Sequence, residues 1–100
     1  MISVLIPAYN HPVAELVAAV HQQCLPLRAF EILIADDASE HPYEADYLQI
    51  GQLANVRIIR LEQNLGRSGI RNLLAEQAQH ELLLFIDGDA ADVPTGFIQQ

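Results

Sequence analysis

Short apolar runs alternate along this chain with stretches in which apolar residues recur at helical spacing. The unbroken apolar run at 82–86 predicts a strand that is buried on both faces. The mostly apolar runs at 2–6 and 30–35 predict two further strands, the first of them stopped by Pro7. The run at 56–61 alternates arginines with aliphatic residues, which predicts a less buried strand at a sheet edge. Apolar residues three and four positions apart predict helices at 12–24 and 67–79. The region 40–55 predicts a short or irregular helix, and another helix is expected from Pro94.

Strands that alternate with helices predict the α/β class. We expect a Rossmann-like open, mainly parallel sheet of about four strands with helices on both faces. The 100 residues fit a single domain, and no internal repeat or linker divides them. In such a sheet, ligands bind beyond the carboxyl ends of the strands, where the strand order reverses.

The charge of the chain narrows the classes of partner. Thirteen acidic residues face five arginines and no lysine, a net charge of −8, which argues against nucleic acid or an anionic membrane as a general partner. A nucleotide is still compatible, because a metal ion can bridge acids to phosphates. The single cysteine, Cys24, has no partner for an internal disulfide and fits the apolar side of a helix. We expect a cytoplasmic location, with a peripheral association with a membrane as the alternative for the full-length protein.

Three predicted strands end in residues with functional chemistry, and all three ends lie on one edge of the sheet. The clearest is Asp87-Gly88-Asp89, where glycine permits a sharp turn or the close approach of a ligand. Two carboxylates at such an edge suit a divalent cation, since hard cations prefer oxygen ligands. Asp-Gly is also ordinary turn chemistry, so a solvated turn is the alternative.

The second strand end carries the adjacent acids Asp36 and Asp37. Either one carboxylate caps a loop or helix while its neighbour is exposed, or one accepts a hydrogen bond from a nucleobase N–H. Two adjacent acids repel each other, so donors or a ligand must compensate. At the first strand end, Tyr9 either stacks on a flat base or packs over the end of the sheet.

The stretch 64–69, NLGRSG, opens the predicted helix at 67–79 and suits a phosphate cradle, although Gly66 alone accounts for an unusual backbone angle. Arg71, one turn into this helix, either reaches an anionic ligand or pairs with Asp36 or Asp87. The four histidines show no metal-ligand spacing and are expected to be structural or exposed.

Four segments, in this order, resemble the N-terminal half of inverting family 2 glycosyltransferases of the GT-A fold. They are SVLIPAYN at 3–10, EILIADDAS at 31–39, NLGRSGIRNLLA at 64–75 and LFIDGD at 84–89. Each segment is weakly specific, whereas four in the right order and spacing along almost the whole chain are highly specific. Residues 1–100 are therefore expected to be the nucleotide-sugar-binding half of such an enzyme, without the acceptor-binding half.

The resemblance implies a role for each matching residue. Pro7, Ala8 and Tyr9 would line the base pocket and Asp37 would meet the base edge. Arg71 would help to hold the nucleotide.

In the family's Asp-x-Asp motif, Asp87 would lie near the ribose with Gly88 beside it, and Asp89 would bind Mn²⁺ or Mg²⁺ bridging the diphosphate. The metal would act as a Lewis acid on the leaving nucleoside diphosphate, and the donor would be a nucleotide sugar, by the family's habit a UDP-sugar.

The chain departs from the family pattern at two points. Ala90 follows the motif where members often carry another acid or polar residue. The family's catalytic base belongs to the second half, so no residue here is expected to be that base, and the 100 residues alone are expected to lack turnover. A surface left by the missing half would favour self-association.

The rival classes lack their own signatures. A receiver domain needs a lysine, and a dinucleotide-binding domain needs a glycine fingerprint after its first strand. A nucleotidylyltransferase is expected to carry a glycine-rich, basic loop after its first strand, where this chain has Pro7-Ala8-Tyr9-Asn10. The remaining alternative is a non-catalytic nucleotide-binding or interaction module with an incomplete site.

Overall fold

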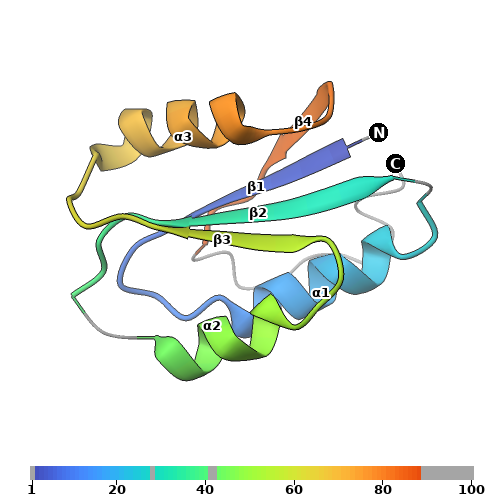
Figure 1. Ribbon diagram of the computed structural model, residues 1–100, viewed down its shortest axis with the longest axis horizontal. Helices are drawn as coiled ribbons and strands as arrows, with labels where there is room; N and C mark the ends of the chain where they lie inside the picture. The colour runs from blue at the N-terminus through green and yellow to red at the C-terminus, as the bar shows by residue number, and fades with distance from the viewer. Residues whose placement is uncertain (1, 28, 41–42, 89–100) are drawn as a thin grey trace.

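A computed structural model describes residues 2–27, 29–40 and 43–88 of the chain as four parallel strands and the helices that connect them (Figure 1). The strand order β3-β2-β1-β4 confirms the expected α/β, Rossmann-like sheet. The elements are β1 Ile2–Ala8, α1 Ala14–Cys24, β2 Phe30–Asp36, α2 Glu44–Gly51, β3 Val56–Arg60, α3 Gly66–Gln77 and β4 Leu82–Phe85. The helix expected from Pro94 lies outside the described residues.

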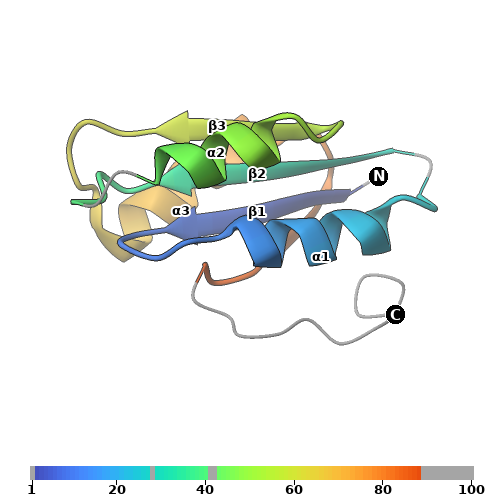
Figure 2. The same cartoon turned by 90° about the horizontal axis from the view of Figure 1, so that it is seen from below.

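Helices cover both faces of the sheet because successive side chains of a strand point to opposite faces. Helices α1 and α2 lie on one face and α3 on the other (Figures 1 and 2). Val4 and Ile6 pack in the larger core under α1 and α2, whereas Leu5 packs in the smaller core under Ile70 and Leu74 of α3. No helix in the described ranges has both the length and the apolar character needed to cross a bilayer.

Two boundaries differ from the expected ones for local reasons. Strand β1 continues through Pro7, which pairs in register with Ala35. The carbonyl oxygen of Pro7 accepts a hydrogen bond from the N–H of Gly88. The missing N–H of Pro7 faces the same side, between the bonds that the N–H groups of Ile86 and Gly88 donate to Leu5 and Pro7. Proline therefore removes one donor from the pairing with the segment after β4, where that strand has already ended. Helix α2 forms within the unclear region because Tyr47 and Ile50 are buried on one face of it.

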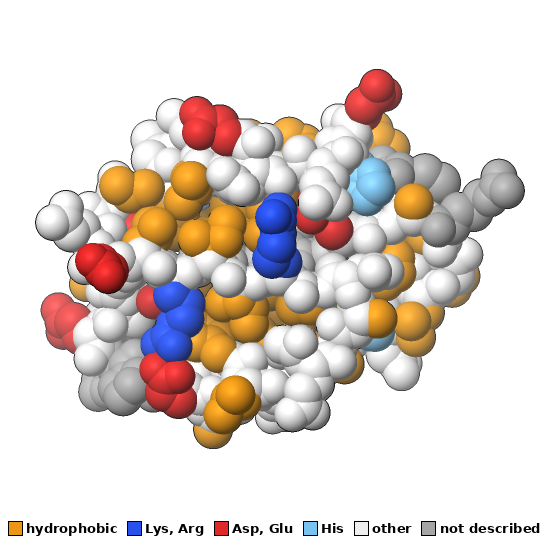
Figure 3. All heavy atoms as spheres, viewed as in Figure 1, with side chains coloured by type: hydrophobic (Ala, Val, Ile, Leu, Met, Phe, Trp, Pro, Cys, Tyr) orange, Lys and Arg blue, Asp and Glu red, His pale blue; other side chains and the backbone are white. Residues whose placement is uncertain are grey.

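The prediction that residues 82–86 form a strand buried on both faces was wrong. The side chains of Leu82 and Leu83 are 63% and 42% exposed, because β4 is the edge strand beyond β1. An apolar run predicts a strand, but the neighbours that cover it are set by topology. The edge position expected for 56–61 is confirmed by β3, whose edge faces the viewer of Figure 3 with apolar side chains visible beside it.

Cys24 is fully buried in the larger core, as expected from its helical position. Burial raises the pKa of its thiol to about 11, so the side chain stays protonated at neutral pH. A buried neutral thiol behaves as a small apolar side chain.

A buried acid fastens the connection between α3 and β4 to the amino-terminal end of the sheet. Glu31, at the start of β2, accepts hydrogen bonds from the hydroxyl of Ser3 at 2.7 Å and from the backbone N–H of Gln79 at 2.6 Å. The Ser3 hydroxyl oxygen in turn accepts the N–H of His80 at 3.2 Å. Arg57 from β3 lies 3.7 Å from the other carboxylate oxygen of Glu31. Three strands and one loop therefore meet at a single carboxylate.

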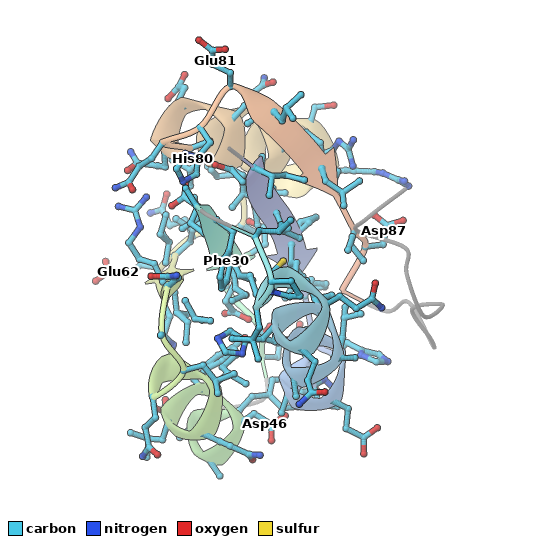
Figure 4. The ribbon with its side chains drawn as sticks, turned by 90° about the vertical axis from the view of Figure 1, so that its right-hand side faces the viewer. Phe30, Asp46, Glu62, His80, Glu81 and Asp87 are labelled. Atoms are coloured by element: carbon cyan, nitrogen blue, oxygen red, sulfur yellow. The ribbon has the colours of Figure 1, made fainter. Side chains whose placement is uncertain are left out.

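We expect Glu31→Ala to lower the free energy of unfolding by about 2–4 kcal/mol, because it leaves buried donors without their acceptor. The matched control is Glu81→Ala, since Glu81 follows His80 but points away from the fold (Figure 4). The control is expected to change stability by no more than about 0.5 kcal/mol. Urea unfolding followed by circular dichroism measures both, and equal effects would show that Glu31 is not a fastening point.

Candidate donor-binding pocket

A cavity of about 440 Å³ opens at the carboxyl edge of the sheet, beside the point where the strand order reverses. The chain adds β2 and β3 on one side of β1 and returns with β4 on the other side. The cavity has the size of a typical small-molecule site and the position expected for a ligand in an open parallel sheet. It is lined by Pro7, Ala8, Tyr9, His11, Asp37, Asn64, Gly66, Arg67, Ile70, Asp87 and Gly88.

Gly88 is the point at which the segment after β4 touches β1. Its N–H donates to the carbonyl oxygen of Pro7 at 3.1 Å. A Cβ atom at this position would lie 2.7 Å from that oxygen and 3.2 Å from the Cα of Ala8. The glycine is therefore required by close contact with the backbone of β1, which is a different reason from the sharp turn or ligand approach expected from sequence. This contact holds Asp87 at the edge of the pocket.

The adjacent acids Asp36 and Asp37 are both buried and point to opposite faces of the sheet. The two carboxylate oxygens of Asp37 accept the backbone N–H groups of Leu65 at 2.6 Å and Gly66 at 3.1 Å, where α3 begins. An acid at a helix N-terminus satisfies unpaired donors and favours the helix dipole. Of the two adjacent acids, Asp37 is therefore the one that caps a helix, as the sequence allowed for one of them. Its implied contact with a base stays a prediction, although Asp37 lines the pocket.

Asp36 faces the α2 side and is not exposed, contrary to the expectation for the neighbour of a capping acid. Its carboxylate accepts the hydroxyl of Tyr47 at 2.6 Å and the hydroxyl of Ser39 at 2.5 Å. Burial, and then the hydrogen bond to Asp36, raise the pKa of Tyr47 above its usual value. The expected repulsion between the two acids is therefore offset by protein donors on both faces.

Tyr9 extends from the loop after β1 beside the pocket with 48% of its surface exposed. Pro7 and Ala8, the two residues before it, also line the cavity. An aromatic ring that is half exposed beside a cavity can stack on a flat ligand, whereas a ring packed over the end of the sheet would be buried. The position of Tyr9 therefore suits a base-binding role.

The arginine that lies at the pocket is Arg67, not Arg71. Nη2 of Arg67 is 4.0 Å from a carboxylate oxygen of Asp87, and the two side chains are 82% and 56% exposed. The guanidinium of Arg71 stacks over the ring of Phe85 at 4.1 Å and does not line the pocket. Because α3 runs away from the carboxyl edge, four residues place Arg71 about 6 Å farther from it. Arg67 lies within the stretch 64–69 that was expected to form a phosphate cradle, but the contact with the nucleotide was expected from Arg71 instead.

The phosphate-cradle stretch is only partly available for a ligand. Gly66 has φ of +80°, so its unusual backbone angle is real, and its N–H is bonded to Asp37. The amide of Asn64 donates to the carbonyl oxygen of Asp37 at 3.0 Å, which holds this loop against β2. His11, which sequence analysis treated as structural or exposed, is exposed and lines the pocket.

The chemistry of the pocket suits a hard cation at one point. The carboxylate of Asp87 is exposed at the pocket and offers oxygen ligands, whereas that of Asp37 is bonded to backbone N–H groups. Asp89, the metal ligand implied by the resemblance, lies outside the described residues. Within the described ranges, no group of three or more metal-ligating side chains comes together.

The sequence model of the family described as "Glycosyl transferase family 2" matches residues 3–99. The chain belongs to this family. It is similar to poly(ribitol-phosphate) beta-N-acetylglucosaminyltransferase TarS of Staphylococcus aureus, with 32% identity over 90 residues, covering 87% of this chain and 16% of the relative. It is also similar to glycosyltransferase AglE of Haloferax volcanii, with 29% identity over 93 residues, covering 90% of this chain and 31% of the relative. The chain thus spans about a sixth to a third of the length of these curated relatives.

Solved structures of glycosyltransferases share this fold. The crystal structure of S. aureus TarS in complex with UDP-GlcNAc matches with a TM-score of 0.76 and 30% identity, covering 88% of this chain and 26% of that chain. The mannosyltransferase PcManGT of Pyrobaculum calidifontis, in complex with GDP-Man and Mn²⁺, matches with a TM-score of 0.79 and 19% identity, covering 89% and 27%. Both comparisons confirm the expected GT-A architecture.

We expect Gly88→Ala to destabilise the fold by about 1–3 kcal/mol, because its Cβ would overlap the backbone of β1. The matched control is Gly51→Ala at the end of α2, where an added Cβ meets Ile58 at an ordinary 3.8 Å. Alanine is the better helix former, so the control is expected to be neutral or slightly stabilising. Thermal unfolding of the two variants tests the contact, and an unchanged midpoint for Gly88→Ala would refute it.

Proposed function

We propose that this chain forms the donor-binding part of a glycosyltransferase that uses a UDP-sugar with Mn²⁺ or Mg²⁺ and transfers the sugar with inversion to an acceptor. The observation that carries the proposal is the pocket at the strand-order reversal, which brings together Tyr9, Asp37, Arg67 and Asp87. The ring of Tyr9 suits stacking on the base, and the carboxylate of Asp37 suits a hydrogen bond to the edge of the base. The charged pair of Arg67 and Asp87 lies where the diphosphate would bind. The binding of UDP and UDP-GlcNAc by TarS, 30–32% identical to this chain, supports the choice of donor.

Asp37 retains the capacity to meet a nucleobase while it caps α3. Each carboxylate oxygen accepts one protein N–H, and an ionised carboxylate has about four acceptor sites in total. A base N–H is therefore a third donor to a carboxylate whose orientation is already fixed. The ring of Tyr9 lies along the same pocket and supplies the stacking surface.

The metal would be held by Asp89 after the end of β4, with Asp87 near the ribose, and when bound it would act as a Lewis acid on the leaving diphosphate. Gly88 fixes the backbone between these two acids against β1. Arg67 supplies a positive charge beside the same site. No residue of this chain is assigned as the catalytic base.

Calorimetric titration with UDP tests the donor site. We expect binding in the presence of Mn²⁺ and a loss of at least tenfold in affinity after chelation of the metal, or in Asp89→Ala, because the diphosphate then faces uncompensated acids. The matched control is Asp46→Asn, since Asp46 lies on α2, away from Asp87 (Figure 4). Absence of UDP binding would refute the proposal, and binding that ignores the metal would favour a non-catalytic nucleotide-binding module.

A pair of arginine variants separates the residue that the structure places at the pocket from the one that the family resemblance implies. We expect Arg67→Gln to weaken UDP binding by about tenfold, since a charged hydrogen bond contributes about 1.5–3 kcal/mol. Arg71→Gln is expected to leave UDP affinity within about twofold and to lower stability through the lost contact with Phe85. The reverse order of affinities would assign the nucleotide to Arg71.

A further inference from the structure

The loop that carries Tyr9 leaves the sheet immediately after β1. The last ladder bond beside it runs from the N–H of Asp37 to the carbonyl oxygen of Ala8 at 2.8 Å. Beyond Ala8 the loop turns through Asn10, whose φ of +51° is unusual for a residue other than glycine. Tyr9 therefore lies between Ala8, which the sheet fixes, and Asn10, which needs another contact to fix it.

That anchor is a pair of hydrogen bonds to the loop after β2. The N–H of Asn10 donates to the hydroxyl oxygen of Ser39 at 2.8 Å. The side-chain oxygen of Asn10 accepts the N–H of Glu40 at 2.6 Å. Both bonds come from one residue, so they fix its position and its direction together.

Ser39 is itself held by the buried carboxylate of Asp36. Its hydroxyl donates to one oxygen of Asp36 at 2.5 Å, and its N–H donates to the other at 3.1 Å. The hydroxyl of Tyr47 on α2 donates to the same carboxylate oxygen as the Ser39 hydroxyl, at 2.6 Å. The Ser39 hydroxyl therefore donates to Asp36 and accepts from Asn10, which links the buried acid to the pocket loop.

We propose that Ser39 and Asp36 are positioning residues that hold Tyr9 in its stacking position through Asn10. We call Asn10, Asp36, Ser39 and Tyr47 the Ser39 clasp. None of the four lines the pocket, so their effect on a ligand passes through the loop and not through direct contact. The inference rests on the proposed function, and it gives the first acid of the Asp36-Asp37 pair a role in donor binding.

The decisive experiment is a double-mutant cycle with UDP and Mn²⁺, measured by calorimetry on wild type, Ser39→Ala, Tyr9→Ala and the double variant. We expect Ser39→Ala to weaken binding by about fivefold to tenfold, near the loss from Tyr9→Ala, which removes a base stack. In the Tyr9→Ala background, Ser39→Ala is expected to cost less than twofold more, because its effect acts through the ring. Ser39→Thr keeps the hydroxyl and is expected to restore affinity to within twofold of wild type.

Ser3 offers a control with the same local chemistry at the opposite edge of the sheet. Its hydroxyl also donates to a buried carboxylate and accepts a backbone N–H. Ser3→Ala is expected to lower the unfolding midpoint at least as much as Ser39→Ala while leaving UDP affinity within about twofold, because Glu31 keeps its hydrogen bond from the N–H of Gln79. If both serine variants weaken binding equally, or if the effects of Ser39→Ala and Tyr9→Ala simply add, the positioning role is refuted.

Amide hydrogen exchange of the ligand-free chain separates failure of this inference from failure of the proposed function. The N–H of Asn10 is expected to exchange at least tenfold faster in Ser39→Ala than in wild type, and the ring resonances of Tyr9 are expected to shift. Unchanged exchange and unchanged ring resonances overturn the clasp whether or not UDP binds. If wild type binds no UDP but Ser39→Ala shows both changes, the donor site is refuted and the clasp is supported as the anchor of the loop.

Discussion

Two buried carboxylates of one strand hold α3 at both of its ends. Glu31 lies at the start of β2 and Asp37 directly after its last residue, and both point to the face that α3 covers. Asp37 accepts backbone N–H groups at the beginning of the helix, and Glu31 accepts the N–H of Gln79 just beyond its end. The two acids are six residues apart in an extended strand, about 20 Å. The fourteen steps from Leu65 to Gln79, nearly all of them within α3, span about the same length at helical rise. Strand and helix are thus matched in length and fastened at both ends.

The pocket depends on this arrangement because its two sides come from the segments that α3 separates. The amino-terminal fastening sets where Arg67 leaves the helix, and the carboxyl-terminal fastening sets where the chain enters β4. Strand β4 then reaches β1 in register, and Gly88 closes against Pro7. The charged pair across the pocket therefore results from two fastenings at opposite ends of a helix and one close backbone contact.

Sequence patterns predicted the parts of this structure that arise from local periodicity. The strands, the helices near 12–24 and 67–79 and the α/β class follow from the spacing of apolar residues. The edge at which the pocket lies follows from the parallel sheet. The opposite directions of Asp36 and Asp37 agree with the strand period, but they were not predicted; repulsion between the two acids was expected instead. Burial of β4 was not predictable, because Leu82 and Leu83 are exposed by the order of strands and not by their own sequence.

The choice between two arginines one turn apart on α3 was likewise not predictable from spacing alone. Arg67 and Arg71 share a helix face, and only the direction of α3 relative to the sheet decides which of them reaches the pocket. The contact of Gly88 with Pro7 was not predictable either, because it joins residues far apart in the sequence and depends on the pairing of strands.

The acids at the carboxyl edge divide into those satisfied by the protein and one that is open to a ligand. Asp36 and Asp37 accept protein donors, whereas Asp87 has only Arg67 at 4.0 Å in the part of the chain that the structure describes. A chain of net charge −8 without lysine repels a diphosphate unless positive charge is supplied locally. A single exposed guanidinium and a helix N-terminus already occupied by Asp37 supply little of it. A divalent cation at the end of β4 would supply the remainder, so the charge distribution of this chain supports the proposed metal dependence.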